Sequence, residues 1–183
     1  SGSCRTTGQR KAGAGRRRHN AAMDLNQPHA LLGGLAPSTF MRRHWQKKPL
    51  LVRQALPGIG APVSRAALFD LASRDEVESR LVVRCAEGWT LRQGPLPRRA
   101  LPPLKQSGWT LLVQGLDLHH AAAHDLLLPF RFLPDARLDD LMLSYASDGG
   151  GVGPHLDSYD VFLIQVHGQR RWRIGRARDR SLR

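Results

Sequence analysis

A glycine-rich loop that runs into an apolar segment constrains this chain more than any other stretch. Residues 149–153 contain four glycines, and the chain continues through His155 and Asp157 into the apolar run 161–166. Glycine permits tight turns and close backbone approaches that other residues resist. Residues two apart in an extended chain point to the same side, so the pattern predicts that His155 and Asp157 present their side chains together.

These two side chains have the chemistry of part of a metal site. A 2-His-1-carboxylate set binds non-haem iron and leaves coordination positions open for substrates. His155 and Asp157 supply one imidazole and the carboxylate of such a set. The same spacing also occurs in surface loops in which the aspartate caps a turn, and the spacing alone leaves both interpretations open.

The residues that follow predict a β-hairpin inside a barrel. Two strand-like runs, 161–166 and 170–174, flank a Gly-Gln dipeptide at 168–169. Apolar side chains on both faces of the first run suit a strand buried within a barrel. Arg170 shares a face with Trp172, and an arginine inside a barrel requires an anion such as a dicarboxylate. The alternative is that the arginines are solvated and only Trp172 packs inward.

The segment 139–175, DDLMLSYASDGGGVGPHLDSYDVFLIQVHGQRRWRIG, resembles the JmjC-type 2-oxoglutarate oxygenases. More narrowly, it is similar to the bacterial ribosomal oxygenases of the cupin superfamily. The segment 36–53 is also similar to the N-terminal part of that family, so the resemblance extends over about 23–175. It implies an α+β fold built around a double-stranded β-helix (jelly roll), with helices at its N-terminus.

The resemblance also implies roles for individual residues. His155 and Asp157 match the first two iron ligands. Arg170 matches the basic residue that pairs with the distal carboxylate of 2-oxoglutarate, and Ser144 matches a hydroxyl that helps to hold this cosubstrate. The third ligand of the family is a second histidine on a later barrel strand, beyond Arg183. We therefore expect an N-terminal part of an oxygenase, truncated before the later barrel strands, which by itself binds iron poorly.

A reaction and partners follow from the same resemblance. The expected protein is an Fe(II)- and 2-oxoglutarate-dependent dioxygenase that forms succinate and carbon dioxide while it hydroxylates a protein side chain. The bacterial branch implies an arginine of a large-subunit ribosomal protein as the substrate, a cytoplasmic location, and a homodimer formed through the missing C-terminal part. Because the third ligand is missing, a non-catalytic cupin-like binding module is the alternative function.

Helices and antiparallel strands are expected upstream of the glycine-rich loop. A helix should begin at Ala36-Pro37-Ser38, and Ser64 should cap another over 65–73. A third helix is expected over 117–130, with Asp117 at its start. Its His120 and His124 lie four residues apart and could hold a metal, although surface histidines are the favoured interpretation. The expected strands are 50–52, 80–85 and 89–92 (a hairpin), 109–113, and 141–146.

Composition excludes several classes of protein. A chain of 183 residues can form one domain with its own core, and no apolar run approaches the 18 residues that suggest a membrane span. Two cysteines do not make a disulfide framework, which suits a reducing compartment.

The net charge of +13 is concentrated at the two ends of the chain. Residues 1–22 carry six basic residues and no acidic one, and residues 168–183 carry seven arginines and one aspartate. Basic ends can bind phosphate, but 1–22 lack periodicity and precede Met23, which suits a native start. We expect a disordered basic leader at 1–22 and a JmjC/cupin-like domain at 23–183. Direct binding to nucleic acid is not expected.

Overall fold

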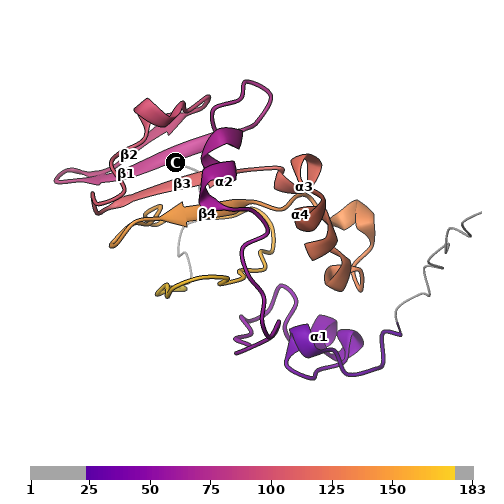
Figure 1. Ribbon diagram of the computed structural model, residues 1–183. Coiled ribbons are helices and arrows are strands. Elements are labelled where there is room, and N and C mark those ends of the chain that lie inside the picture. The colour runs from indigo at the N-terminus through magenta and orange to yellow at the C-terminus, as the bar shows by residue number, and fades with distance from the viewer. Residues whose placement is uncertain (1–23, 176–183) are drawn as a thin grey trace, which may run out of the picture.

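The computed structural model describes residues 24–175. The leader expected at 1–22 and the last arginines of the chain lie outside this range. Four strands form one antiparallel sheet in the order β2-β1-β3-β4 (Figure 1). They are β1 (Ser79–Cys85), β2 (Gly88–Gln93), β3 (Trp109–Val113) and β4 (Leu143–Ala146). The helices are α1 (Pro37–Arg43), α2 (Arg65–Leu71), α3 (Leu116–His119) and α4 (Ala121–Leu126), with short 3₁₀ turns at Ala30–Leu32, Arg98–Ala100, Leu128–Phe130 and Asp135–Arg137.

The local predictions for the first half of the chain are largely confirmed. Pro37 is the first residue of α1, and the Ser64 hydroxyl accepts a hydrogen bond from the Ala67 N–H at 3.2 Å at the start of α2. The hairpin closes where Cys85 pairs with Gly88. The helices and the antiparallel sheet agree with the expected α+β class, and with part of a jelly roll.

α2 covers one face of the sheet (Figure 1). Its buried Leu68 and Phe69 belong to a hydrophobic cluster that includes Leu81, Leu111 and Val113 of the sheet. Leu81 is the cross-strand partner of Leu111, and such partners point to the same side. This face therefore forms the main core of the described residues.

The opposite face of the sheet carries Ser144, one of the candidate site residues. Val82 pairs with Thr110, and Leu112 pairs with Ser144, so these side chains point away from α2. Val82, Thr110 and Leu112 are nevertheless buried. The chain that follows β4 crosses this face, as the contacts of Gly150 with Thr110 and of Arg170 with Ser144 show.

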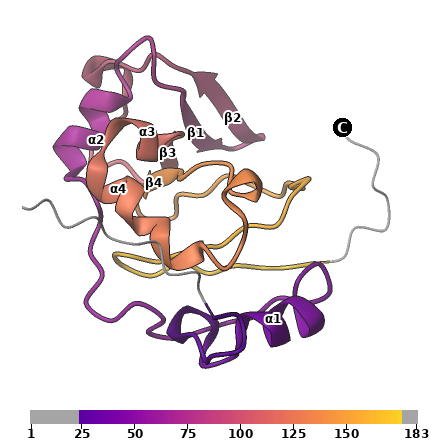
Figure 2. The same cartoon turned by 90° about the vertical axis from the view of Figure 1, so that its right-hand side faces the viewer.

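The segment 151–175 lies between the sheet and α1 (Figures 1 and 2). Phe162 and Ile164 are half-buried and pack against a second cluster, which contains Leu31, Leu32, Phe40, Phe130, Phe132 and Leu133. Val161 and Leu163 are exposed by 47% and 53%. The alternation expected over 161–166 is present, but only one of its two faces is buried.

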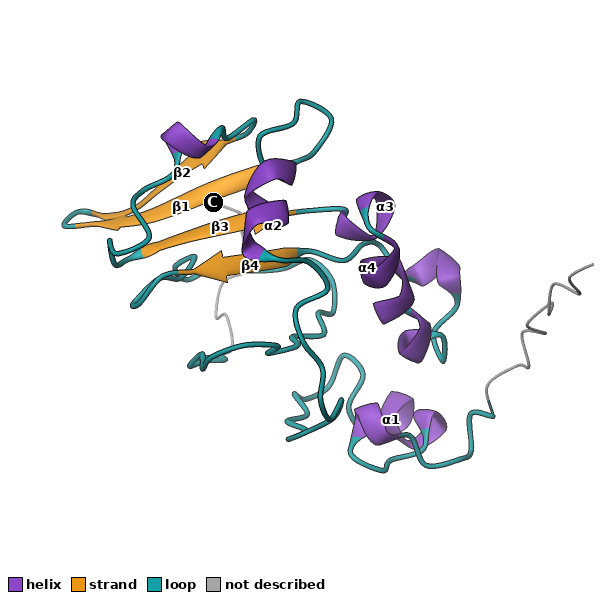
Figure 3. Ribbon diagram, viewed as in Figure 1, coloured by secondary structure: helices purple, strands orange, loops and turns teal. Residues whose placement is uncertain are grey.

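Two expected strand features are absent from the described residues. Gly168 turns the chain at φ +67°, yet 161–166 and 170–174 form no ladder and are drawn as loop in Figure 3. The segment 50–52 is also unpaired. An extended segment becomes a strand only when a neighbour satisfies its backbone groups, and within 24–175 these segments have no such neighbour. The predictions of strands here were therefore wrong.

The helix expected over 117–130 is broken. His120 adopts an extended conformation (φ −147°, ψ 121°) between α3 and α4. Asp117 does not cap a helix; its carboxylate instead accepts a hydrogen bond from the Leu141 N–H at 2.8 Å. That long-range bond ties the start of α3 to the segment before β4. None of the helices in the described part has the length and apolar composition needed to cross a membrane.

A second carboxylate, that of Asp140, also links the segment before β4 to the start of α3, and its ionisation makes this link sensitive to pH. Asp140 accepts a hydrogen bond from the Gly115 N–H at 2.7 Å. Burial raises the pKa of the Asp140 carboxyl, the Gly115 bond lowers it in part, and the charge of Asp139 raises it further. A raised carboxyl pKa means that the folded state favours the neutral form.

We expect Asp140→Asn to raise the free energy of unfolding at pH 7, because asparagine keeps an oxygen acceptor for Gly115 and removes the charge. The penalty of the ionised carboxylate is present above the raised pKa and disappears as the pH falls below the ordinary carboxyl range. The gain should therefore shrink as the pH approaches about 4. Urea unfolding between pH 4 and 8 measures it, with the exposed Asp75→Asn as the control. An equal gain at every pH would contradict the assignment.

Candidate metal centre and cosubstrate site

The glycine-rich loop packs against the start of β3, at Trp109. The Ser147 N–H donates to the Trp109 carbonyl at 3.0 Å, and the Trp109 N–H donates to the Ser147 hydroxyl at 3.1 Å. A Cβ on Gly150 would overlap the Trp109 carbonyl oxygen and lie 2.9 Å from the Ser147 carbonyl oxygen. Only glycine fits at position 150 without a backbone shift, which confirms that the loop needs glycine for close approach.

His155 and Asp157 lie on the same side of the chain that leaves this loop. The His155 Nε2 atom is 3.6 Å from the Asp157 Oδ2 atom, and both side chains are partly exposed, by 45% and 44%. This separation is too long for a hydrogen bond. Two donor atoms that each bind one divalent ion at about 2.0–2.2 Å lie about 3–4 Å apart, so the two atoms are spaced as neighbouring ligands would be.

A backbone carbonyl fixes the state of the His155 ring. The Nδ1 atom lies 3.0 Å from the Gly153 carbonyl oxygen. A carbonyl can only accept, so this bond requires the proton on Nδ1 and leaves a lone pair on Nε2 of the neutral ring. Metal-binding histidines typically donate their second N–H to such an acceptor. The two residues therefore fit a divalent ion in both donor type and orientation.

Ser144 and Arg170, which are 26 residues apart, also come together. The Arg170 Nη1 atom donates to the Ser144 hydroxyl at 3.2 Å, and its guanidinium carbon lies 5.8 Å from the centre of the Trp172 ring. Arg170 is half-buried, and no carboxylate among the described residues pairs with it. A guanidinium in such a position can hold a carboxylate ligand in two parallel hydrogen bonds.

The set of metal ligands is incomplete within 24–175. No group of three histidine, cysteine or carboxylate side chains suited to a metal occurs among these residues. His120 and His124 likewise have no third partner there. The Nδ1 atom of His120 is buried without a hydrogen bond, and His124 is exposed. Within 24–175, the structure therefore places two candidate metal ligands near the loop, and no third side chain completes a site at His120 and His124.

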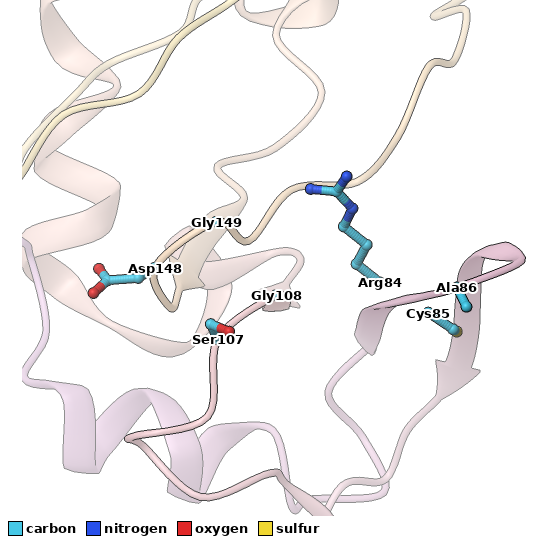
Figure 4. A pocket seen from close by; sticks show the side chains of 7 residues that line it. All are labelled: Arg84, Cys85, Ala86, Ser107, Gly108, Asp148 and Gly149. Carbon is cyan, nitrogen blue, oxygen red and sulfur yellow. The ribbon is translucent and has the colours of Figure 1, made fainter.

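A shallow pocket of about 550 Å³ opens beside the start of the loop (Figure 4). Its lining includes Arg84, Cys85, Asp148 and Gly149. Figure 4 shows Arg84 and Asp148 on either side of Gly149, with the Asp148 carboxylate pointing away from Arg84. None of the four residues singled out from the sequence lines it, so the pocket and the candidate site are different features.

Known proteins are similar to this chain in both sequence and fold. The JmjC domain family matches residues 125–183, a span that includes all four candidate residues. Ribosomal protein uL16 3-hydroxylase of Escherichia coli K12 is 46% identical over 136 residues, which cover 74% of this chain and 36% of that protein. Ribosomal oxygenase 1 of Gallus gallus is 30% identical over 161 residues, which cover 79% of this chain and 25% of that protein.

A solved structure agrees with these relatives. The ribosomal oxygenase YcfD of Escherichia coli, in complex with cobalt and 2-oxoglutarate, superposes with a TM-score of 0.61 at 41% identity. The match covers 66% of this chain and 33% of YcfD. The chain thus spans about a third of the length of these bacterial relatives. The JmjC match, the sequence identity and the common fold make this chain similar to the JmjC-type ribosomal oxygenases over the part of those proteins that it spans.

Proposed function

We propose that the protein is an Fe(II)- and 2-oxoglutarate-dependent oxygenase that hydroxylates an arginine of a large-subunit ribosomal protein. The observation that carries the proposal is the geometry of His155 and Asp157, whose donor atoms lie 3.6 Å apart on one side of the chain. The relatives support it: one is a ribosomal protein uL16 3-hydroxylase, and the structure of YcfD is a complex with cobalt and 2-oxoglutarate. Cobalt accepts the same imidazole and carboxylate donors as iron.

Each residue has a stated role in this proposal. His155 Nε2 and the Asp157 carboxylate would hold the metal, and the Gly153 carbonyl keeps the His155 ring in the binding tautomer. When bound, Fe(II) would let dioxygen oxidise both substrates, so that one oxygen atom enters succinate as 2-oxoglutarate loses carbon dioxide and the other hydroxylates the protein side chain. The third ligand would come from a residue outside the described range.

Arg170 and Ser144 would bind the end of 2-oxoglutarate that is remote from the metal. The half-buried Arg170 has no acidic partner among residues 24–175, so a bound carboxylate would supply the missing negative charge. Ser144 already accepts a hydrogen bond from Arg170 and keeps its own hydroxyl proton for the ligand.

We expect Arg170→Ala to raise the KM for 2-oxoglutarate by about 10–100-fold, because hydrogen bonds to a charged group each contribute about 1.5–3 kcal/mol. Ser144→Ala removes a neutral hydrogen bond and should raise the KM by about fivefold. Arg171→Ala is the matched control, since that neighbour is exposed. Steady-state succinate formation at varied 2-oxoglutarate measures all three. An equal KM for the Arg170 and Arg171 variants would remove Arg170 from the site.

The function itself is tested with the full-length protein, Fe(II), 2-oxoglutarate and an arginine-containing peptide from the ribosomal protein. Succinate should form in step with the addition of one oxygen atom to the arginine, located by tandem mass spectrometry. A peptide with lysine at that position should stay unmodified. Succinate formation without oxidation of the peptide would disprove the substrate, and absence of both would disprove the activity.

A non-catalytic binding module is the second candidate. It is favoured by the incomplete set of metal ligands among residues 24–175. It predicts that the full-length protein binds the ribosomal protein but neither cobalt nor 2-oxoglutarate, which calorimetry can decide.

The oxygenase proposal includes a cytoplasmic location and a homodimer. The nearly neutral charge of residues 23–167 supports recognition of a protein rather than direct binding to nucleic acid.

A further inference from the structure

An aromatic side chain from a distant strand lies against the loop that carries the candidate ligands. A Cβ on Gly153 would be 2.8 Å from the Cδ1 atom and 2.9 Å from the Nε1 atom of Trp89. A Cβ on Gly151 would be 3.2 Å from the Cη2 atom of the same indole. The five-membered ring of Trp89 therefore contacts Gly153, and its six-membered ring contacts Gly151, so the indole spans the loop.

The path of the chain explains this contact. The loop leaves β4 at one edge of the sheet, whereas Trp89 lies on β2 at the other edge. Trp89 pairs with Arg84, which shares a face of β1 with Val82, and this is also the face of Ser144. The loop crosses the sheet on that face and meets the indole. The glycines at 151 and 153 give the indole the space that it occupies.

The contact leads directly to His155. Gly153 touches the indole and also supplies the carbonyl that accepts the proton of His155 Nδ1. A shift of Gly153 would turn that carbonyl and release the ring of His155. We propose that Trp89 is a positioning residue for the metal site. Its indole keeps Gly153 in the position in which the His155 Nε2 atom faces the Asp157 carboxylate. This inference rests on the proposed function.

Trp89 contributes little to the core, which separates this role from general packing. Its side chain is 39% exposed, and four of its five companions in β2 are exposed as well. Leu91 lies two residues further on the same face and is 58% exposed. Truncation of either side chain should change the free energy of unfolding similarly and by little.

The first test is a titration of the full-length protein with Co²⁺ alone, followed by the visible absorption of the bound ion. We expect Trp89→Ala to weaken Co²⁺ binding by about 10–100-fold and to alter the spectrum, as the loss of outer-sphere support for a metal ligand does. Trp89→Phe keeps a ring above Gly153 and should recover most of the affinity. Leu91→Ala, the matched control, should stay within about twofold of the wild type. Equal affinities and spectra for the Trp89→Ala and Leu91→Ala variants would overturn the proposal.

A second test enlarges residue 151 and then makes residue 89 smaller in the same chain. It probes the contact directly and remains available if Trp89→Ala does not fold. Gly151 has no positive φ, so alanine is strained there only by the indole. Gly151→Ala should weaken Co²⁺ binding, and Trp89→Phe in the same chain should restore part of it, because phenylalanine lacks the outer ring atoms. If the double variant instead loses the sum of the Co²⁺ binding energies lost by the two single variants, the contact does not act as proposed.

Failure of this inference and failure of the proposed function are distinguishable with the same titration. If Asp157→Ala abolishes Co²⁺ binding while Trp89→Ala leaves it unchanged, the metal site stands and only the role of Trp89 is wrong. If Asp157→Ala leaves Co²⁺ binding unchanged, the proposed metal site is wrong, and the proposed function is wrong with it.

Discussion

Replacement of Asp157 by alanine is expected to lower the metal affinity of the full-length protein by more than about 100-fold and to abolish succinate formation. The reason is the geometry of the pair: the Asp157 carboxylate is the only acidic group within 4 Å of the His155 ring nitrogens among the described residues. Loss of an outer-sphere partner already costs about 10–100-fold in metal affinity, so loss of the ligand itself should cost more.

The measurement for Asp157→Ala combines a Co²⁺ titration with an assay of succinate formation at saturating 2-oxoglutarate. Asp160→Ala is the matched control, since Asp160 is an exposed carboxylate three residues further along the same segment. His155→Ala should reproduce the effect of Asp157→Ala, because each side chain supplies one ligand. Succinate formation that survives Asp157→Ala at the wild-type rate would remove this residue from the metal centre.

The second large effect is expected at the base of the glycine-rich loop. Trp109→Ala should lower the free energy of unfolding by about 3–5 kcal/mol, the usual cost of truncating a buried aromatic side chain to alanine. Trp109 is fully buried and its ring centre lies 5.3 Å from that of Tyr145 and 6.4 Å from that of Phe69. Its Nε1–H donates to the Gln106 carbonyl at 2.9 Å, so the truncation would also remove this hydrogen bond.

Urea unfolding of the full-length protein measures the effect of Trp109→Ala. Trp172→Ala is the control, because that side chain is 44% exposed and its truncation should cost less than about 1 kcal/mol. Trp109→Phe should fall between the two. Equal losses for the Trp109 and Trp172 variants would mean that the cluster beneath the loop is not the stabilising core of this part of the chain.

Features that depend on neighbouring residues followed from the sequence. The cap at Ser64, the turn between β1 and β2, and the common side of His155 and Asp157 need only a few residues of chain to specify them. The resemblance added the jelly-roll class and the pairing of Arg170 and Ser144 in one site, and the hydrogen bond between these two residues is consistent with that pairing. Their role in binding 2-oxoglutarate stays a prediction.

Predictions that needed a distant partner failed or could not be made. The runs 161–166 and 170–174 have the composition of strands, but composition does not provide the neighbouring backbone that a ladder requires. The helix break at His120 accompanies the long-range bond of Asp117 to the segment before β4. Trp89 had no local pattern to mark it, because its significance comes from glycines more than sixty positions later in the chain.

The sequence by itself determined the α+β class, the cap at Ser64, the hairpin of β1 and β2, and the pair of side chains that would bind a metal. Each of these is set by the geometry of consecutive residues. Only the tertiary structure decided which glycine faces the Trp109 carbonyl and which indole lies against the loop. These depend on where the chain crosses the sheet, and that path follows from the packing of the whole fold.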